Sequence, residues 1–241
     1  MNTYRTNAII AGVLYIIGTV AGVLSRVLSQ SLGAAADPLA AAAANANQVI
    51  VASLCVMVMC LALAMVPVVL YPVLRRHSEV LALGYVVFRG GLETVAGLLT
   101  PIAWLLLVAL GQLHVQGPDA GASSLQTAAA LLWEPGAVSS ILSIVFCLGA
   151  AMFYTVLYRS RLVPRWLSVW GLAGLLPYLA AAFMVMFAGL DEKSSSATLM
   201  YLPLAVQEMV LAVWLIVKGF NPAVSAAKPA QTATNELLCA A

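Results

Sequence analysis

Three charged side chains lie within long apolar segments of the sequence, where a charge needs a partner or a ligand. Arg89 and Glu93 are four residues apart, so a helix would carry both on one face. Glu208 belongs to a separate apolar segment near the end of the chain. Charged side chains are costly in hydrocarbon, and they therefore pair with one another or line a polar cavity. We predict that Arg89, Glu93 and Glu208 lie together and form a ligand-binding site.

The charge balance of these three residues leaves two interpretations open. One arginine and two carboxylates carry a formal charge of −1. This surplus would be relieved by a proton, a bound cation or water. In the first interpretation the three side chains bind a polar headgroup, an ion or a proton in a central cavity. In the second they form a buried ion-pair cluster that only fixes the register of the helices.

Other catalytic and metal-binding patterns are missing from the sequence. It contains no GxSxG motif, no P-loop and no glycine-rich dinucleotide fingerprint. The four cysteines form no CxxC pair, and neither His77 nor His114 has a metal-ligand spacing to another histidine or to a cysteine. We therefore expect no cofactor, no metal site and no Ser–His catalysis. An enzyme remains an alternative only if Glu93 or Glu208 acts as a general acid or base on a lipid.

The composition indicates that the surface of the protein faces lipid. Of the 241 residues, 63% are apolar and only 8% are charged. A soluble protein carries about a quarter charged residues to cover its surface. The net charge of +2 is too small to indicate a nucleic-acid partner, and we expect none. The partner predicted by the composition is the lipid bilayer, and a protein partner or homo-oligomer is left open.

The apolar segments predict an all-α bundle of six transmembrane helices. Crossing about 30 Å of hydrocarbon takes about 20 helical residues. Six segments meet that length, and we place them near 7–28, 48–74, 80–112, 137–158, 166–188 and 198–219. We predict one transmembrane domain over 1–222. The Ala-, Pro- and Thr-containing tail over 223–241 is predicted to be a disordered cytoplasmic segment.

The basic residues flanking the six segments predict which side of the membrane each loop occupies. Those expected on the cytoplasmic side are Arg5, Arg75, Arg76, Arg159, Arg161, Arg165, Lys218 and Lys228. The opposite loops contain Asp37, His114, Asp119, Asp191, Glu192 and the single basic residue Lys193. By the positive-inside rule both termini are cytoplasmic, and we predict a multi-pass protein of a bacterial inner (plasma) membrane.

The turn between the fourth and fifth segments combines basic side chains with a tryptophan. Arg159, Arg161 and Arg165 precede Trp166 there. We interpret this turn as an anchor that touches anionic lipid, because basic clusters beside a membrane are attracted to the negative cytoplasmic leaflet. A binding role for the turn is an open alternative.

Counting residues from the cytoplasmic side places the three intramembrane charges at similar depths. At about 1.5 Å per residue, Arg89 lies about 15 Å deep. Glu208, counted back along the chain from the cytoplasmic end of the sixth segment, reaches a similar depth. Glu93 lies about one turn further out. A contact between Arg89 and Glu208 is therefore allowed.

Two extracytoplasmic segments are predicted to form short helices, and the N-terminus allows two interpretations. Asp37 followed by Pro38 is an N-cap and first-turn pair. Residues 124–134 are predicted to form an interfacial helix. Residues 1–36, with a basic start and an Ala34-Ala35-Ala36 end, also resemble a signal peptide whose cleavage would leave five spans.

Three separate stretches of the chain carry a family resemblance. The first contains LYPVLRRH at 70–77, LALGY at 81–85 and Phe88-Arg89 to Glu93. The second contains LYRSRLVPRWLS at 157–168, and the third runs from Gln207-Glu208 to WLIVKGFN at 214–221. In order and spacing they resemble the bacterial membrane family catalogued as domain of unknown function 4386, over about 5–222. The resemblance implies a six-helix bundle, places all three intramembrane charges within matching motifs and implies no activity. One departure is Gly90-Gly91, where bulkier apolar residues are typical and where packing beside Arg89 is expected to be looser.

These observations lead to a functional hypothesis with two alternatives. The hypothesis is a protein that binds or moves a small amphiphilic or lipid-like ligand in a cavity lined by Arg89, Glu93 and Glu208. The first alternative is a structural or partner subunit whose charges only stabilise the bundle. The second is an intramembrane lipid-modifying enzyme.

Overall fold

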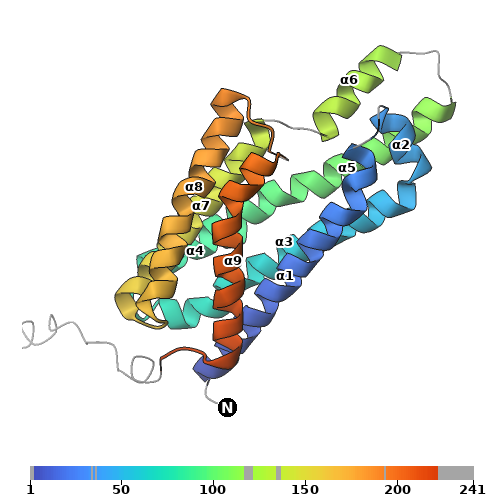
Figure 1. The fold of residues 1–241 in the computed structure, drawn as a ribbon. Coiled ribbons are helices and arrows are strands. Elements are labelled where there is room, and N and C mark those ends of the chain that lie inside the picture. Colours follow the sequence, from blue (N-terminus) through green and yellow to red (C-terminus); the bar gives the residue numbers. More distant parts are fainter. Residues whose placement is uncertain are drawn as a thin grey trace, which may run out of the picture.

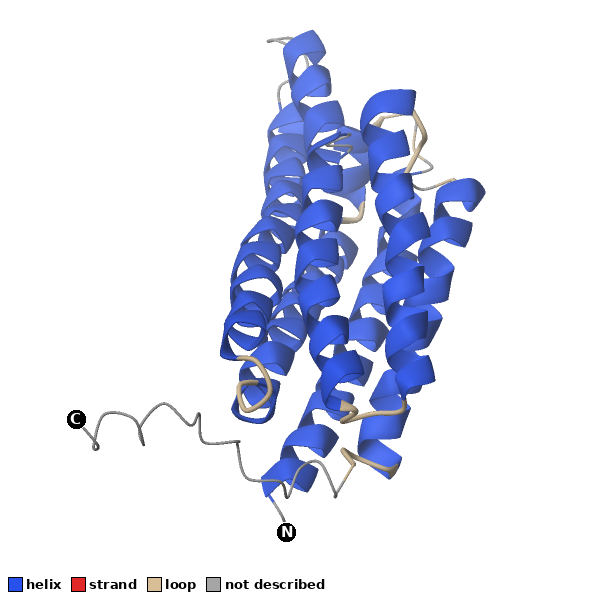
Figure 2. Ribbon diagram, turned by 90° about the vertical axis from the view of Figure 1, so that its left-hand side faces the viewer, coloured by secondary structure: helices blue, strands red, loops and turns tan. Residues whose placement is uncertain are grey.

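The computed structural model describes residues 3–33, 35, 37–116, 122–133, 137–192 and 194–221. Within these residues all regular structure is helical, and Figure 2 shows helices joined by short loops, with no strand in the described part. The prediction of an all-α protein is therefore confirmed. The predicted disordered tail over 223–241 lies outside the described residues.

Among the described residues, six helical stretches are long and apolar enough to cross a membrane. The continuous ones are α1 (Thr3–Gly33), α3 (Ala46–Leu74), α7 (Ala137–Ser160), α8 (Arg165–Ala188) and α9 (Ser195–Val217). The third span consists of α4 (Glu79–Tyr85), η1 (Val86–Leu92) and α5 (Glu93–Gln116) in succession. The chain is therefore a multi-pass membrane protein, and the observed helices overlap all six predicted segments.

Both short helices predicted from the sequence are present. α2 (Pro38–Ala44) begins after Asp37, whose carboxylate accepts hydrogen bonds from the backbone N–H groups of Leu39 and Ala40. Only Asn45 separates α2 from α3, so this helix leads directly into the second span. α6 (Ala122–Trp133) overlaps the predicted helix over 124–134.

The middle of the third span is a π-helix, which the sequence did not predict. η1 contains Arg89 and the Gly90-Gly91 pair. A Cβ atom at Gly90 would lie 3.3 Å from Pro67 Cγ on α3, so glycine allows close approach of these two helices. A Cβ at Gly149 on α7 would lie 3.1 Å from the backbone nitrogen of Arg89. The expected loose packing is thus absent at Gly90, whereas at Gly91 a Cβ would meet no atom of the described residues within 4 Å.

The spans form two groups that meet along α9. Figure 1 shows α1, α3 and α5 running together on one side of the bundle, and α7, α8 and α9 on the other. α9 packs against α1 and against α8, and η1 packs against both α3 and α7. The largest buried cluster draws on both groups, and Tyr15, Tyr85 and Tyr154 are among its fully buried side chains. The third span and α9 are therefore placed to carry facing polar groups at the centre of the molecule.

The two ends of the described chain lie at the same end of the bundle. The guanidinium group of Arg5 donates hydrogen bonds to carbonyl oxygens at the end of α9, the nearest being that of Ile216 at 2.6 Å. The backbone N–H of Asn221 donates to the carbonyl of Leu162, in the turn between α7 and α8, at 2.8 Å. The start of α1, the end of α9 and the α7–α8 turn are thus neighbours.

The turn between α3 and α4 belongs to this end as well, because the Arg76 guanidinium lies 5.0 Å from the centre of the Tyr4 ring. We call this end, with Arg5, Arg75, Arg76, Arg161, Arg165 and Lys218, the basic end. His114 lies on the α2 side, where its Nε2 is 3.8 Å from an Asp37 carboxylate oxygen. The described residues among those predicted to share the cytoplasmic side do share one end of the bundle, and Lys228 lies outside the described residues.

Candidate functional site

Arg89 connects two carboxylates that come from different spans. Its Nη1 lies 2.6 Å from Glu93 Oε1, one helical turn further along the third span. Its Nη2 lies 3.4 Å from Glu208 Oε1 on α9. The contact that depth counting allowed between Arg89 and Glu208 is therefore present, and the three residues form one cluster. We call Arg89, Glu93 and Glu208 the central cluster.

The members of the central cluster differ in burial and in hydrogen bonding. The Arg89 side chain is 4% exposed, whereas the side chains of Glu93 and Glu208 are 16% and 17% exposed. Within the described part of the chain, the buried Oε2 of Glu93 has no hydrogen-bond partner. A carboxylate oxygen without a donor is costly in an apolar environment. The cluster therefore has unused acceptor capacity at Glu93, on the side of the cluster away from the basic end.

The guanidinium group of Arg89 lies over one aromatic ring, and buried aromatic residues pack beside Tyr85, one turn before it. The Arg89 Cζ lies 4.5 Å from the centre of the Phe146 ring on α7, a cation–π distance. Tyr85, one turn before Arg89, stacks on Phe153 with ring centres 4.6 Å apart. The Tyr85 and Tyr15 hydroxyl groups share a hydrogen bond of 3.1 Å. These contacts hold the third span against α7 and α1, and they fix the position from which Arg89 extends.

Next to Glu208, Gln207 takes part in a second buried polar network. Tyr154 donates its hydroxyl hydrogen to Gln207 Oε1 at 2.6 Å. Gln207 Nε2 donates to the carbonyl of Leu167 at 3.0 Å. Gln207 is fully buried, and its contacts are with α7 and α8 rather than with the central cluster. Adjacent residues on a helix point about 100° apart, which explains why Gln207 and Glu208 have different partners.

The buried hydrogen bonds beside the central cluster were not predicted from the sequence. They involve Tyr15, Tyr85, Tyr154 and Gln207. A buried tyrosine hydroxyl needs a hydrogen-bond partner, so Tyr15, Tyr85 and Tyr154 within apolar segments were a usable signal. That signal marks each as a polar group but does not identify its partner, since the partners come from other spans. Among the described residues, no group of three or more His, Cys, Asp or Glu side chains converges as a metal site. Cys55, Cys60 and Cys147 are free thiols.

The fold and the cluster define a class, that of multi-pass helical membrane proteins with a buried intramembrane ion cluster. The chain belongs to the family described as Domain of unknown function (DUF4386), whose sequence profile matches residues 10–219. The match includes all three residues of the central cluster and confirms the resemblance found in the sequence. Comparison with curated proteins and with solved structures gave no significant match.

Proposed function

We propose that this protein binds, or moves, a small amphiphilic or lipid-like molecule whose polar part contacts the central cluster. The polar part of such a molecule would donate hydrogen bonds or carry positive charge. The observation that supports this most directly is Glu93 Oε2, which has no hydrogen-bond partner among the described residues, in a cluster whose two carboxylates share one arginine. A donor at Glu93 would satisfy that oxygen and offset the surplus negative charge.

The side chains of Glu93 and Glu208 are less deeply buried than that of Arg89, which supports access for such a molecule. The π-helical geometry of η1 supports the same proposal, since π segments within α-helices are frequent at functional sites. The basic end is proposed to face the cytoplasm of a bacterial cell, with the protein in the inner (plasma) membrane.

The proposal is tested by identifying molecules that co-purify with the full chain. The wild-type protein and Glu93→Gln are purified in the same detergent, extracted and compared by mass spectrometry. Glutamine keeps the size of the side chain but removes the charge that a cationic or donor group would pair with. We expect an amphiphile that is enriched in the wild-type extract and reduced about tenfold with Glu93→Gln, since charge-assisted hydrogen bonds contribute about 1.5–3 kcal/mol.

The matched control is Glu192→Gln, between α8 and α9 and outside the spans. This control also neutralises one carboxylate, but at a position away from the central cluster. It should leave the set of extracted molecules unchanged. Identical extracts from wild type and Glu93→Gln would contradict the proposal.

A structural role for the central cluster is the second candidate. The contact of Arg89 with Glu208 joins η1 to α9 and thus links the two groups of spans. If this were its only role, Glu208→Gln and Glu93→Gln would change the melting temperature but not the extracted molecules. Melting temperatures and extracts from the same preparations therefore distinguish the two candidates.

A further inference from the structure

A second polar site lies at the basic end, in a pocket between the α7–α8 turn and the chain that follows α9. The pocket has a volume of about 500 Å³. Its apolar side includes Leu162, Val163 and Phe220, which are all buried in the main core. The N–H of Asn221 donates to the carbonyl of Leu162 and holds the two segments together. The pocket therefore lies between two segments that are joined by a backbone hydrogen bond and packed on the main core.

Three cations line this pocket without an acidic residue among its lining side chains. They are Arg161, Arg165 and Lys218. All three are exposed, and within the described residues none of them lies within ion-pairing distance of a carboxylate. Arg165 lies over the Tyr158 ring, 5.2 Å from its centre. A site with three converging cations and no acid favours an anion.

The backbone of Arg161 has a conformation that an arginine rarely adopts. Its φ is +56°, in the left-handed region, directly after the last residue of α7. Its N–H donates to the carbonyl of Leu157 at 3.1 Å and closes the helix. Glycine is the usual residue at such a helix end, because it has no Cβ. Here a charged side chain occupies a position where glycine would be more stable, which indicates that the charge has a use.

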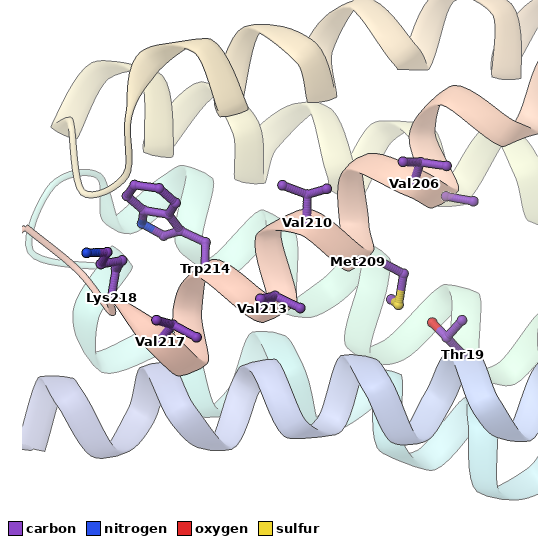
Figure 3. Close-up of a pocket in the computed structure, with 9 residues that line it drawn as sticks. Thr19, Val206, Met209, Val210, Val213, Trp214, Val217 and Lys218 are labelled. Atoms are coloured by element: carbon purple, nitrogen blue, oxygen red, sulfur yellow. The ribbon is translucent and has the colours of Figure 1, made fainter.

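An apolar groove continues from the basic pocket along the lipid-facing side of α9. It has a volume of about 630 Å³ and shares Trp214 and Lys218 with the pocket. Figure 3 shows Val206, Met209, Val210 and Val213 along it, with Thr19 of α1 beside its far end.

The length of the groove matches one leaflet of a membrane. From Val206 to Lys218 the helix rises about 18 Å, at about 1.5 Å per residue. One leaflet of hydrocarbon is about 15 Å thick, half of the roughly 30 Å core. The apolar groove can therefore hold a chain that ends where the three cations begin. Trp214, at the junction, is a residue type favoured at the membrane interface.

We propose that this continuous surface is a binding site for an anionic membrane phospholipid. The headgroup phosphate binds Arg161, Arg165 and Lys218, and one acyl chain lies along α9 in the groove. Arginine suits the phosphate because its planar guanidinium group donates two parallel hydrogen bonds to phosphate oxygens. The site is separate from the central cluster, so it can be tested independently of the proposed function.

The test uses the full chain in detergent with an equal mixture of phosphatidylglycerol and phosphatidylcholine that have the same acyl chains. Native mass spectrometry then counts the lipids retained on the protein. We expect the wild type to retain phosphatidylglycerol in preference to phosphatidylcholine. Each of Arg161→Gly and Arg165→Gln should reduce that preference about fivefold, since one basic side chain near a membrane surface contributes about 1 kcal/mol.

Arg161→Gly also separates binding from folding. Glycine relieves the left-handed backbone, so the melting temperature should stay the same or rise while lipid retention falls. Val213→Trp fills the groove without changing charge and should reduce retention of the lipid. Soluble glycerol phosphate, which has no chain, should not displace it. Arg75→Gln, at the basic end but outside the pocket, is the matched charge control and should retain phosphatidylglycerol as the wild type does.

Four results would overturn the proposal. One is equal retention of the two lipids by the wild type. Another is a loss of preference with Arg75→Gln as large as that with Arg161→Gly, which would indicate general surface charge rather than a site. The remaining two are displacement of the lipid by glycerol phosphate and unchanged retention by Val213→Trp, either of which would show that the groove has no part in binding.

Discussion

The central cluster and the basic end contain the same residue types in opposite situations. Arg89 is buried, and both carboxylates nearest to it form ion pairs with it. Arg161 and Arg165, at the basic end, are exposed and have no carboxylate partner among the described residues. In hydrocarbon an arginine must be paired within the protein, whereas at the interface water and lipid headgroups can solvate it. The same side chain is thus part of the internal framework in one region and open to a ligand in the other.

The largest effect is expected from removing the buried arginine. Arg89→Ala leaves two carboxylates without their shared cation, and breaking a buried ion pair in this way costs about 3 kcal/mol or more. We expect a large fall in the thermal unfolding temperature of the protein in detergent.

The comparison variant is Arg165→Ala at the basic end. It removes no buried partner, so its stability should stay within about 0.5 kcal/mol of the wild type. Equal melting temperatures for Arg89→Ala and the wild type would show that the pairing contributes nothing to stability.

A smaller effect is expected from the polar network beside the cluster. Tyr154→Phe removes the donor to Gln207 Oε1 and leaves a buried amide oxygen without a partner, which costs about 1–2 kcal/mol. Tyr158→Phe is the control, because Tyr158 is 39% exposed. Thermal unfolding should separate the two variants. If both lowered the melting temperature equally, the buried hydrogen bond would not be the cause.

The smallest effect is expected on the pH dependence of folding stability, through His77 near the basic end. Partial burial, together with the neighbouring Arg76, lowers the pKa of His77 below its ordinary value. The unfolded chain therefore binds a proton more readily than the folded chain as the pH falls below about 6.5. Lowering the pH from about 7.5 to about 5.5 should cost a little stability through this residue.

This pH effect is isolated by comparing the wild type with His77→Gln. The melting temperature of the wild type should fall slightly more than that of the variant over the same pH change. A larger loss in the variant would reverse the sign and contradict the lowered pKa.

The sequence was sufficient to predict the spans and the members of the central cluster. Hydrocarbon requires long apolar helices, so composition along the chain locates them. The depth of Arg89 and Glu208 could be counted because an α-helix rises by a constant amount per residue. The N-cap at Asp37 was predictable because it depends only on its immediate neighbours.

The features that were not predicted depend on contacts between segments distant in the chain. The π-helix over Val86–Leu92 packs against α3 and α7, and no local pattern specifies that register. The partners of Tyr85 and Gln207 come from other spans.

The sequence by itself determined that this is a membrane protein of six spans, that most basic residues outside the spans gather at one end, and that three charges lie within the apolar segments. It could do so because the cost of placing polar groups in hydrocarbon is large at every residue and adds up along each helix. Only the tertiary structure decided that Glu93 Oε2 has no partner within the described part of the chain and that Arg161, Arg165 and Lys218 line one pocket next to the α9 groove. Those features depend on where side chains from separate helices meet, and packing between helices decides that.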